Sequence, residues 1–127
     1  MATVRLPPNL IHTRVEEVER RKGPPPWSET IILNEHIQAN LICHAPGMTN
    51  RAHYHPEHDE FWVVLKGELV WELDGEAPIH ARTGDVVLAP RGKTHLIRTV
   101  GSGPSLRLAI GVPDIPHYDP ATRALMP

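Results

Sequence analysis

Short apolar runs separated by turn residues fill the chain from Trp27 onward. They read "ETIIL", "IQANLIC", "EFWVVL", "ELVWEL", "DVVLA", "HLIRTV" and "SLRLAIGV". Each run has the length of a strand, β-branched residues are frequent, and Gly, Pro, Asn or Asp interrupt the pattern about every 8 to 12 residues. Gly67 and the Asp74-Gly75 pair are hairpin signals. The pattern therefore predicts an all-β fold, either a sandwich or a barrel.

A short helix is predicted near the start of the chain, in "HTRVEEVERRKG". Thr13, followed three residues later by Glu16, matches a capping box at a helix N-terminus. Gly23 and the three prolines after it end the pattern. A helix of about three turns is marginal alone, so we expect Val15 and Val18 to pack against the rest of the domain.

The length of 127 residues predicts a single domain. We divide it into an N-terminal extension that contains the helix (1–29), a β domain (30–112) and a proline-broken C-terminal tail (113–127).

A net charge of −2 provides no long-range attraction for nucleic acid or an anionic membrane. The chain has no apolar stretch of the roughly 18 residues that span a bilayer. Cys43 is the single cysteine, and "MATVRLPPNL" lacks the apolar run of a secretion signal. We therefore expect a cytoplasmic protein with a small-molecule ligand and with neither nucleic acid nor membrane as a partner.

The stretch "RAHYHPEHDEFW" concentrates histidines and carboxylates. Alternate residues of a strand point to the same face, so Arg51, His53 and His55 are expected to share one face. "PEHD" is predicted to turn the chain, which returns Glu60 opposite the two histidines. Two imidazoles and one carboxylate in such an arrangement suit a transition metal, although histidines in a polar loop are as often simply solvated. A second segment, "GDVVLAPRGKTHLIRT", presents His95 as a possible fourth ligand.

The two segments together resemble the two signature motifs of the cupin superfamily. The first has Gly47, five residues, His53, one residue, His55, four residues, Glu60, six residues and Gly67. The second has Gly84, five residues, Pro90, one residue, Gly92, two residues and His95. The chain departs from the second motif at Thr99, where Asn is usual, but that position is not a ligand. The short spacer between the motifs is similar to that of small single-domain bacterial cupins, and the resemblance covers about residues 30–112.

The resemblance implies a single jelly-roll β-barrel and a homodimer. It also implies one divalent transition metal per chain (Fe, Mn, Ni, Co, Cu or Zn), held by His53, His55, Glu60 and His95. An apolar stripe of Phe61, Val63 and Leu65, on the face opposite Glu60, could form the dimer interface.

For function, we expect a metal-dependent dioxygenase or related oxidoreductase that acts on a small anionic organic molecule. "RAHYH" and "EFW" loosely resemble ring-cleaving dioxygenases of the 3-hydroxyanthranilate type, which implies that Arg51 holds a substrate carboxylate, although the spacing between His and Glu differs. An Arg51 that simply reaches solvent is the competing interpretation. Trp62 and Trp71 are candidate substrate-binding residues, or core residues.

The alternatives are a non-catalytic cupin that binds a small ligand and a metal-dependent sugar isomerase. His44, His80 and His117 fit no ligand spacing, and we assign them surface or hydrogen-bonding roles.

Overall fold

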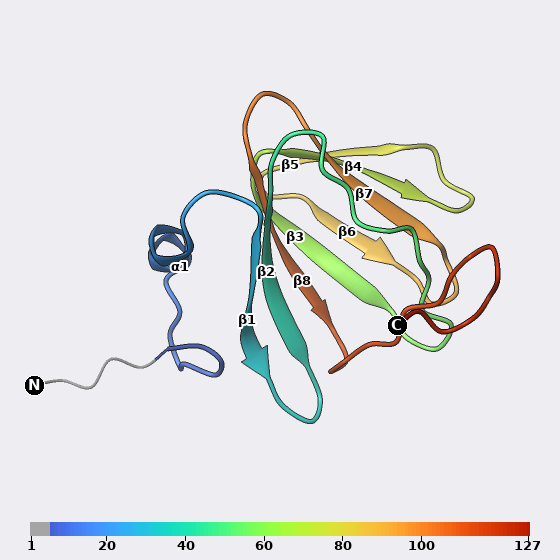
Figure 1. The fold of residues 1–127 in the computed structure, drawn as a ribbon, viewed down its shortest axis with the longest axis horizontal. Coiled ribbons are helices and arrows are strands. Elements are labelled where there is room, and N and C mark those ends of the chain that lie inside the picture. Colours follow the sequence, from blue (N-terminus) through green and yellow to red (C-terminus); the bar gives the residue numbers. More distant parts are fainter. Residues whose placement is uncertain (1–5) are drawn as a thin grey trace, which may run out of the picture.

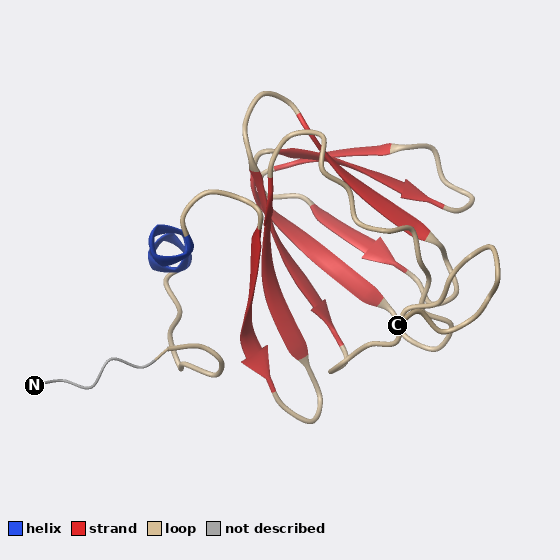
Figure 2. Ribbon diagram, in the orientation of Figure 1, coloured by secondary structure: helices blue, strands red, loops and turns tan. Residues whose placement is uncertain are grey.

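The computed structural model describes residues 6–127, so the first five residues of the stretch inspected for a secretion signal lie outside it. It contains one helix, α1 (Val15–Lys22), and eight strands (Figures 1 and 2). The strands are β1 (Trp27–Leu33), β2 (Gln38–His44), β3 (Glu60–Lys66), β4 (Glu68–Leu73), β5 (Ile79–Arg82), β6 (Val86–Ala89), β7 (His95–Val100) and β8 (Ser105–Gly111). No helix of residues 6–127 has the length and apolar character that crossing a bilayer requires.

The strands form two antiparallel sheets, in the orders β1-β2-β8-β3-β6 and β5-β4-β7. Figure 1 shows the three-stranded sheet lying across the upper end of the five-stranded sheet. Within residues 6–127 the hydrogen bonds do not close the two sheets into one continuous ring. The prediction of an all-β fold with one short N-terminal helix is confirmed.

The main core lies between the two sheets. It contains Trp62 and Val64 from β3, Trp71 from β4, Ile97 from β7 and Ala109 from β8. A second core lies on the other face of the five-stranded sheet, under α1. In β2, burial alternates strictly along the strand, so its odd-numbered residues pack toward the helix and its even-numbered residues face the interior.

The helix begins later than the capping box predicts. Arg14 occupies the N-cap position, and no side chain caps this end. Gly23 ends the helix as expected, because its backbone N–H reaches the carbonyl oxygen of Glu19. Val18 is buried and Val15 packs beside it, which confirms that the helix docks through these residues.

The outer face of the β3–β6 pair exposes apolar side chains. Phe61, Val86 and Leu88 are 37%, 64% and 53% exposed. Phe61 lies opposite Leu88, and Val63 lies opposite Val86. Leu65 instead packs toward the core under α1. Of the predicted stripe, Phe61 and Val63 therefore remain on this outer face. The homodimer that the stripe was expected to form stays a prediction.

Gly67, which joins β3 to β4, is expected to tolerate no side chain. Its φ is +77°, and a Cβ atom would lie 2.5 Å from the carbonyl oxygen of Pro104. Gly84 has a similar φ of +94° but open space around it. Gly84→Ala should therefore lower the free energy of unfolding by about 1 to 2 kcal/mol, the cost of the left-handed backbone, and Gly67→Ala by clearly more. Urea denaturation of both variants checks this, and equal losses would show that the approach of Pro104 has no effect.

Candidate metal centre

The four candidate ligands come from three parts of the chain. Glu60 begins β3 and His95 begins β7, whereas His53 and His55 lie in the irregular segment between β2 and β3. Two backbone hydrogen bonds join His53 to His95, with N···O distances of 3.3 and 2.9 Å. The backbone N–H of Gly92 donates to the carbonyl oxygen of His55 at 2.8 Å. The glycine turn of the second segment thus fixes the first segment beside β7.

The side chains of these residues converge inside the fold. One donor atom from each of His53, His55, Glu60 and His95 lies within 4.8 Å of the corresponding atom of every other. The three histidines are buried, and the Glu60 side chain is only 13% exposed. Oε1 of Glu60 lies 3.0 Å from Nε2 of His55 and 3.5 Å from Nε2 of His95. The geometry therefore brings together the four residues that the sequence selected.

Each imidazole is oriented by a backbone carbonyl oxygen at its other nitrogen. Nδ1 of His53 donates to Arg51 and Nδ1 of His55 donates to Pro116, both at 2.7 Å, and Nδ1 of His95 donates to Lys93 at 3.3 Å. A carbonyl oxygen only accepts, so Nδ1 carries the proton in each neutral ring. The unprotonated Nε2 atoms of His55 and His95 then face Glu60. Metal-ligating histidines commonly have their other ring nitrogen bound to a backbone carbonyl oxygen in this way.

This donor set fits a divalent cation. Nε2 of His95 is buried without a hydrogen-bond partner among the described residues, and Nε2 of His55 faces a carboxylate oxygen. Two acceptors at that distance need a proton or a cation between them. One ion bound by three imidazole nitrogens and one carboxylate would satisfy all four groups, and this N/O set suits Mn, Fe, Co, Ni, Cu or Zn.

The pKa shifts within the cluster determine which of its groups are in the protonation state that binds a metal ion. Burial, reinforced by the neighbouring His95, lowers the pKa of His53 to about 3, so that its ring is neutral at pH 7. Burial opposes ionisation of Glu60, but the hydrogen bond from His55 and the nearby His95 imidazole outweigh it and lower the pKa of that carboxyl group to about 2. Burial also disfavours charge on His55, yet the hydrogen bonds to Glu60 and Pro116 raise its pKa overall.

Acid is expected to destabilise the metal-free protein. The pKa of His53 is about 3 when folded and 6.5 when free, so the unfolded chain takes up the proton first, and stability falls from about pH 6.5 toward 3. Ionised Glu60 stabilises the folded state fully above its ordinary pKa of 4.5, and this stabilisation is lost as the pH falls toward about 2. The raised pKa of His55 acts oppositely, favouring the fold below pH 6.5.

Melting temperatures measured in EDTA check this prediction. The wild type should lose stability steadily from about pH 6.5 to 4, whereas His53→Gln, which has no titrating ring, should lose less over the same range. Identical pH profiles for the two proteins would contradict the role assigned to His53.

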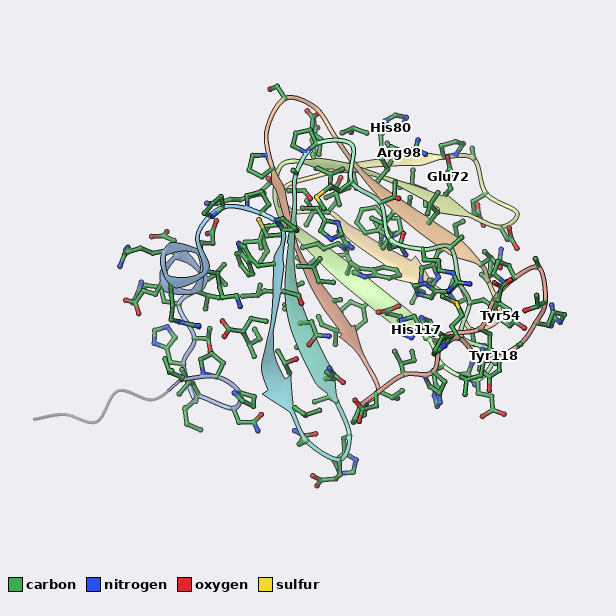
Figure 3. The ribbon with its side chains drawn as sticks, viewed as in Figure 1. Tyr54, Glu72, His80, Arg98, His117 and Tyr118 are labelled. Atoms are coloured by element: carbon green, nitrogen blue, oxygen red, sulfur yellow. The ribbon has the colours of Figure 1, made fainter. Side chains whose placement is uncertain are left out.

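His117 is a neighbour of the cluster that the sequence interpretation assigned elsewhere. Its ring centroid lies 4.2 Å from that of His53 and 4.9 Å from that of His55. The tail reaches this position because Tyr118 exchanges backbone hydrogen bonds with Tyr54 (Figure 3). Burial and the nearby His55 lower the pKa of His117. No motif spacing could have indicated it, since the contact depends on how the tail folds back.

An open pocket of about 210 Å³ leads to the cluster. Its lining includes Glu60 of the cluster, Ala109 of β8, Gln38 and Asn40 of β2, and His117 of the tail. The volume suits a small organic molecule.

The three residues predicted to bind substrate lie in two different environments. Arg51 is 63% exposed and pairs with Asp119 at 3.0 Å, which places its guanidinium outside the interior that contains His53. Trp62 and Trp71 are 2% and 0% exposed and belong to the core between the sheets. The Trp62 ring centroid lies 5.1 Å from that of His95, so this indole supports a ligand directly. Their substrate roles stay predictions.

Comparisons with known proteins agree with this geometry. Residues 40–111 match the family model described as Cupin domain. An uncharacterized protein of Aquifex aeolicus (strain VF5) is 34% identical over 112 residues, covering 88% of this chain and 91% of that protein. Oxalate oxidase GF-2.8 of Triticum aestivum is 36% identical over 82 residues, which cover 59% of this chain and 36% of that relative. The match to the plant enzyme therefore spans only a minor part of its length.

The fold has counterparts among solved structures. An uncharacterized conserved protein with a double-stranded β-helix domain from Klebsiella pneumoniae subsp. pneumoniae superposes with a TM-score of 0.71. It is 20% identical, and the match covers 88% of this chain and 92% of that one. The two sheets described above therefore form a double-stranded β-helix.

Proposed function

The chain belongs to the cupin superfamily, and from that premise we propose that it is a metal-dependent dioxygenase or related oxidoreductase acting on a small carboxylic acid. One observation carries the proposal: three buried imidazoles, each with Nδ1 bound to a backbone carbonyl oxygen, converge with the Glu60 carboxylate so that one ligand atom of each residue lies within 4.8 Å of the others. Such preorganised donors are costly to bury without a cation. A bound divalent ion supplies Lewis acidity and, where it is redox-active, an electron couple.

The charges of the site favour an anionic substrate. The three imidazoles are neutral ligands and Glu60 contributes one negative charge, so a site that holds a divalent ion keeps a net charge of about +1. The similarity to a plant oxalate oxidase supports an acid as substrate and oxidation as the reaction type. Dioxygen is the electron acceptor in this proposal.

The protein surroundings would restrict water at the reacting atoms. Trp62 and Ile97 are each 2% exposed and belong to the core between the sheets, on the inner side of the cluster. His117 and Glu60 both line the pocket. A small acid would thus enter beside the tail residue His117 and meet the cluster at Glu60.

Dioxygen consumption tests the proposal. Protein loaded anaerobically with Fe(II) or Mn(II) is mixed with oxalate, a catechol acid or a diketone acid in an oxygen electrode. Uptake is expected with one class of acid in the wild type and in His58→Ala, and its loss is expected in Glu60→Ala. His58 is the matched control because it lies in the same loop but outside the cluster.

The result also separates the proposal from the alternatives. Absence of uptake with every acid and either metal, together with reversible binding of one acid, would assign the chain to the non-catalytic binding cupins. Conversion of a sugar without dioxygen uptake would assign it to the metal-dependent isomerases.

A further inference from the structure

Arg107 of β8 is a buried cation with incomplete hydrogen bonding. The residue is 3% exposed, and its Nε and Nη1 atoms have no hydrogen-bond partner among residues 6–127. It lies opposite Val64 of β3 and Ile42 of β2. It shares a strand face with Ala109, which belongs to the core between the sheets. The guanidinium is therefore attached to the interior face of the fold.

The charge of Arg107 is not neutralised locally. Burial lowers its pKa to about 10, which still leaves it charged at neutral pH, and Glu60 is the acidic group that acts on it. The Glu60 carboxylate is already shared by His55 and His95. Buried charges are normally paired, so an interior guanidinium without a bonded carboxylate is expected to receive an anion from outside.

The side chains on the interior face of β8 become smaller toward the pocket. Arg107 is followed on that face by Ala109 and then by Gly111, with about 7 Å between alternate residues. Ala109 and Gly111 line the pocket together with Glu60. Only the small residues Ala109 and Gly111 therefore lie on that face between Arg107 and the end of β8 that lines the pocket.

We propose that Arg107 binds a carboxylate of the substrate within the fold. The substrate class is then a small acid with a second oxygen donor near the carboxylate, such as a dicarboxylate, a 2-oxo acid or a 2-hydroxy acid. One end pairs with the guanidinium while the other reaches the His53, His55, Glu60 and His95 cluster. The inference rests on the proposed function and names its substrate class.

Arg107 is better placed for this role than Arg51. The guanidinium of Arg51 already has a carboxylate partner, Asp119, and is mostly exposed. A substrate that bound Arg51 would have to displace an intramolecular ion pair at the surface. A substrate that bound the unpaired N–H groups of Arg107 would displace no ion pair. Burial also shields these groups from water, which weakens ion pairs.

Calorimetric titration of Mn(II)-loaded protein with oxalate tests the inference, with the neutral amide oxamide as a ligand control. Arg107→Met keeps the apolar stem and removes the charge, and it should weaken oxalate binding about 10- to 100-fold, as expected for lost charge-assisted hydrogen bonds. Arg107→Lys should weaken it less. Arg98→Met is the matched control, because Arg98 lies on the outer face of the three-stranded sheet (Figure 3) and pairs with Glu72.

Two further readouts distinguish an anion receptor from a structural arginine. Arg107→Met should bind the same amount of manganese as the wild type, and its melting temperature should not fall, because an unpaired buried charge is removed. Oxalate should raise the melting temperature of the wild type more than that of the variant.

Wild-type affinity in Arg107→Met, a loss of affinity in Arg51→Met instead, or no binding of oxalate by the wild type would each overturn the inference. Binding is measured without turnover. Absence of dioxygen uptake with intact Arg107-dependent binding would therefore contradict the proposed function alone.

Discussion

Replacing His55 by alanine is expected to reduce bound metal from about one ion per chain to nearly none. The ring is 2% exposed, its Nδ1 is fixed by Pro116, and its Nε2 lies 3.0 Å from Glu60. Alanine removes a preorganised nitrogen ligand. A water molecule in the resulting cavity would be a weaker ligand, because no covalent bond holds it in position. Elemental analysis after loading with Mn(II) or Zn(II) and exhaustive dialysis measures the effect.

A matched control keeps this result specific. His58→Ala removes an imidazole from the same loop, but His58 is not part of the ligand cluster, so its metal content should equal that of the wild type. The metal should also raise the melting temperature of the wild type and of His58→Ala but not of His55→Ala, since only a bound ion stabilises the folded state. An unchanged metal content in His55→Ala would disprove the ligand assignment.

The four-ligand set could be predicted because two segments of the sequence resemble the cupin motifs, which imply these ligands together. Glu60 returns beside the two histidines through a short turn, and His95 follows a glycine turn whose Gly92 bonds to His55. The apolar runs likewise predicted the strands, because alternating burial leaves its pattern in the sequence, as β2 shows. Turns and strand period connect residues that are close in the chain, whereas His95, which begins β7, was placed by its motif.

The features that sequence could not place depend on distant contacts. Within residues 51–55 only His53 and Tyr54 form isolated bridges and there is no regular strand, so strand alternation did not apply to Arg51, which pairs with Asp119. His117 reached the cluster only because Tyr118 pairs with Tyr54. Arg107 did leave a signal, a charged residue at an interior position of "SLRLAIGV", but that signal is readable only once the register of β8 is known.

Trp71→Ala is expected to lower the free energy of unfolding by about 3 to 5 kcal/mol, as large-to-small changes of a buried aromatic residue do. The side chain is 0% exposed, and its ring centroid lies 5.6 Å from that of Trp62, so alanine would open a cavity at the centre of the core between the sheets. A domain of this size is commonly stable by only about 5 to 15 kcal/mol, so the variant should be close to unfolding at 37 °C. Urea denaturation at low temperature measures the loss.

Trp71→Phe separates packing from the polar atom of the indole. Nε1 of Trp71 is buried without a hydrogen-bond partner among the described residues, so phenylalanine would remove a donor that gains nothing in the folded state. The expected loss is below about 1.5 kcal/mol, because most of the buried ring surface is kept. Trp27→Ala is the surface comparison, since that ring is half-buried at the start of β1 and donates to the carbonyl oxygen of Gly23. A loss in Trp71→Phe as large as that in Trp71→Ala would show instead that the indole N–H makes a stabilising hydrogen bond in the folded state.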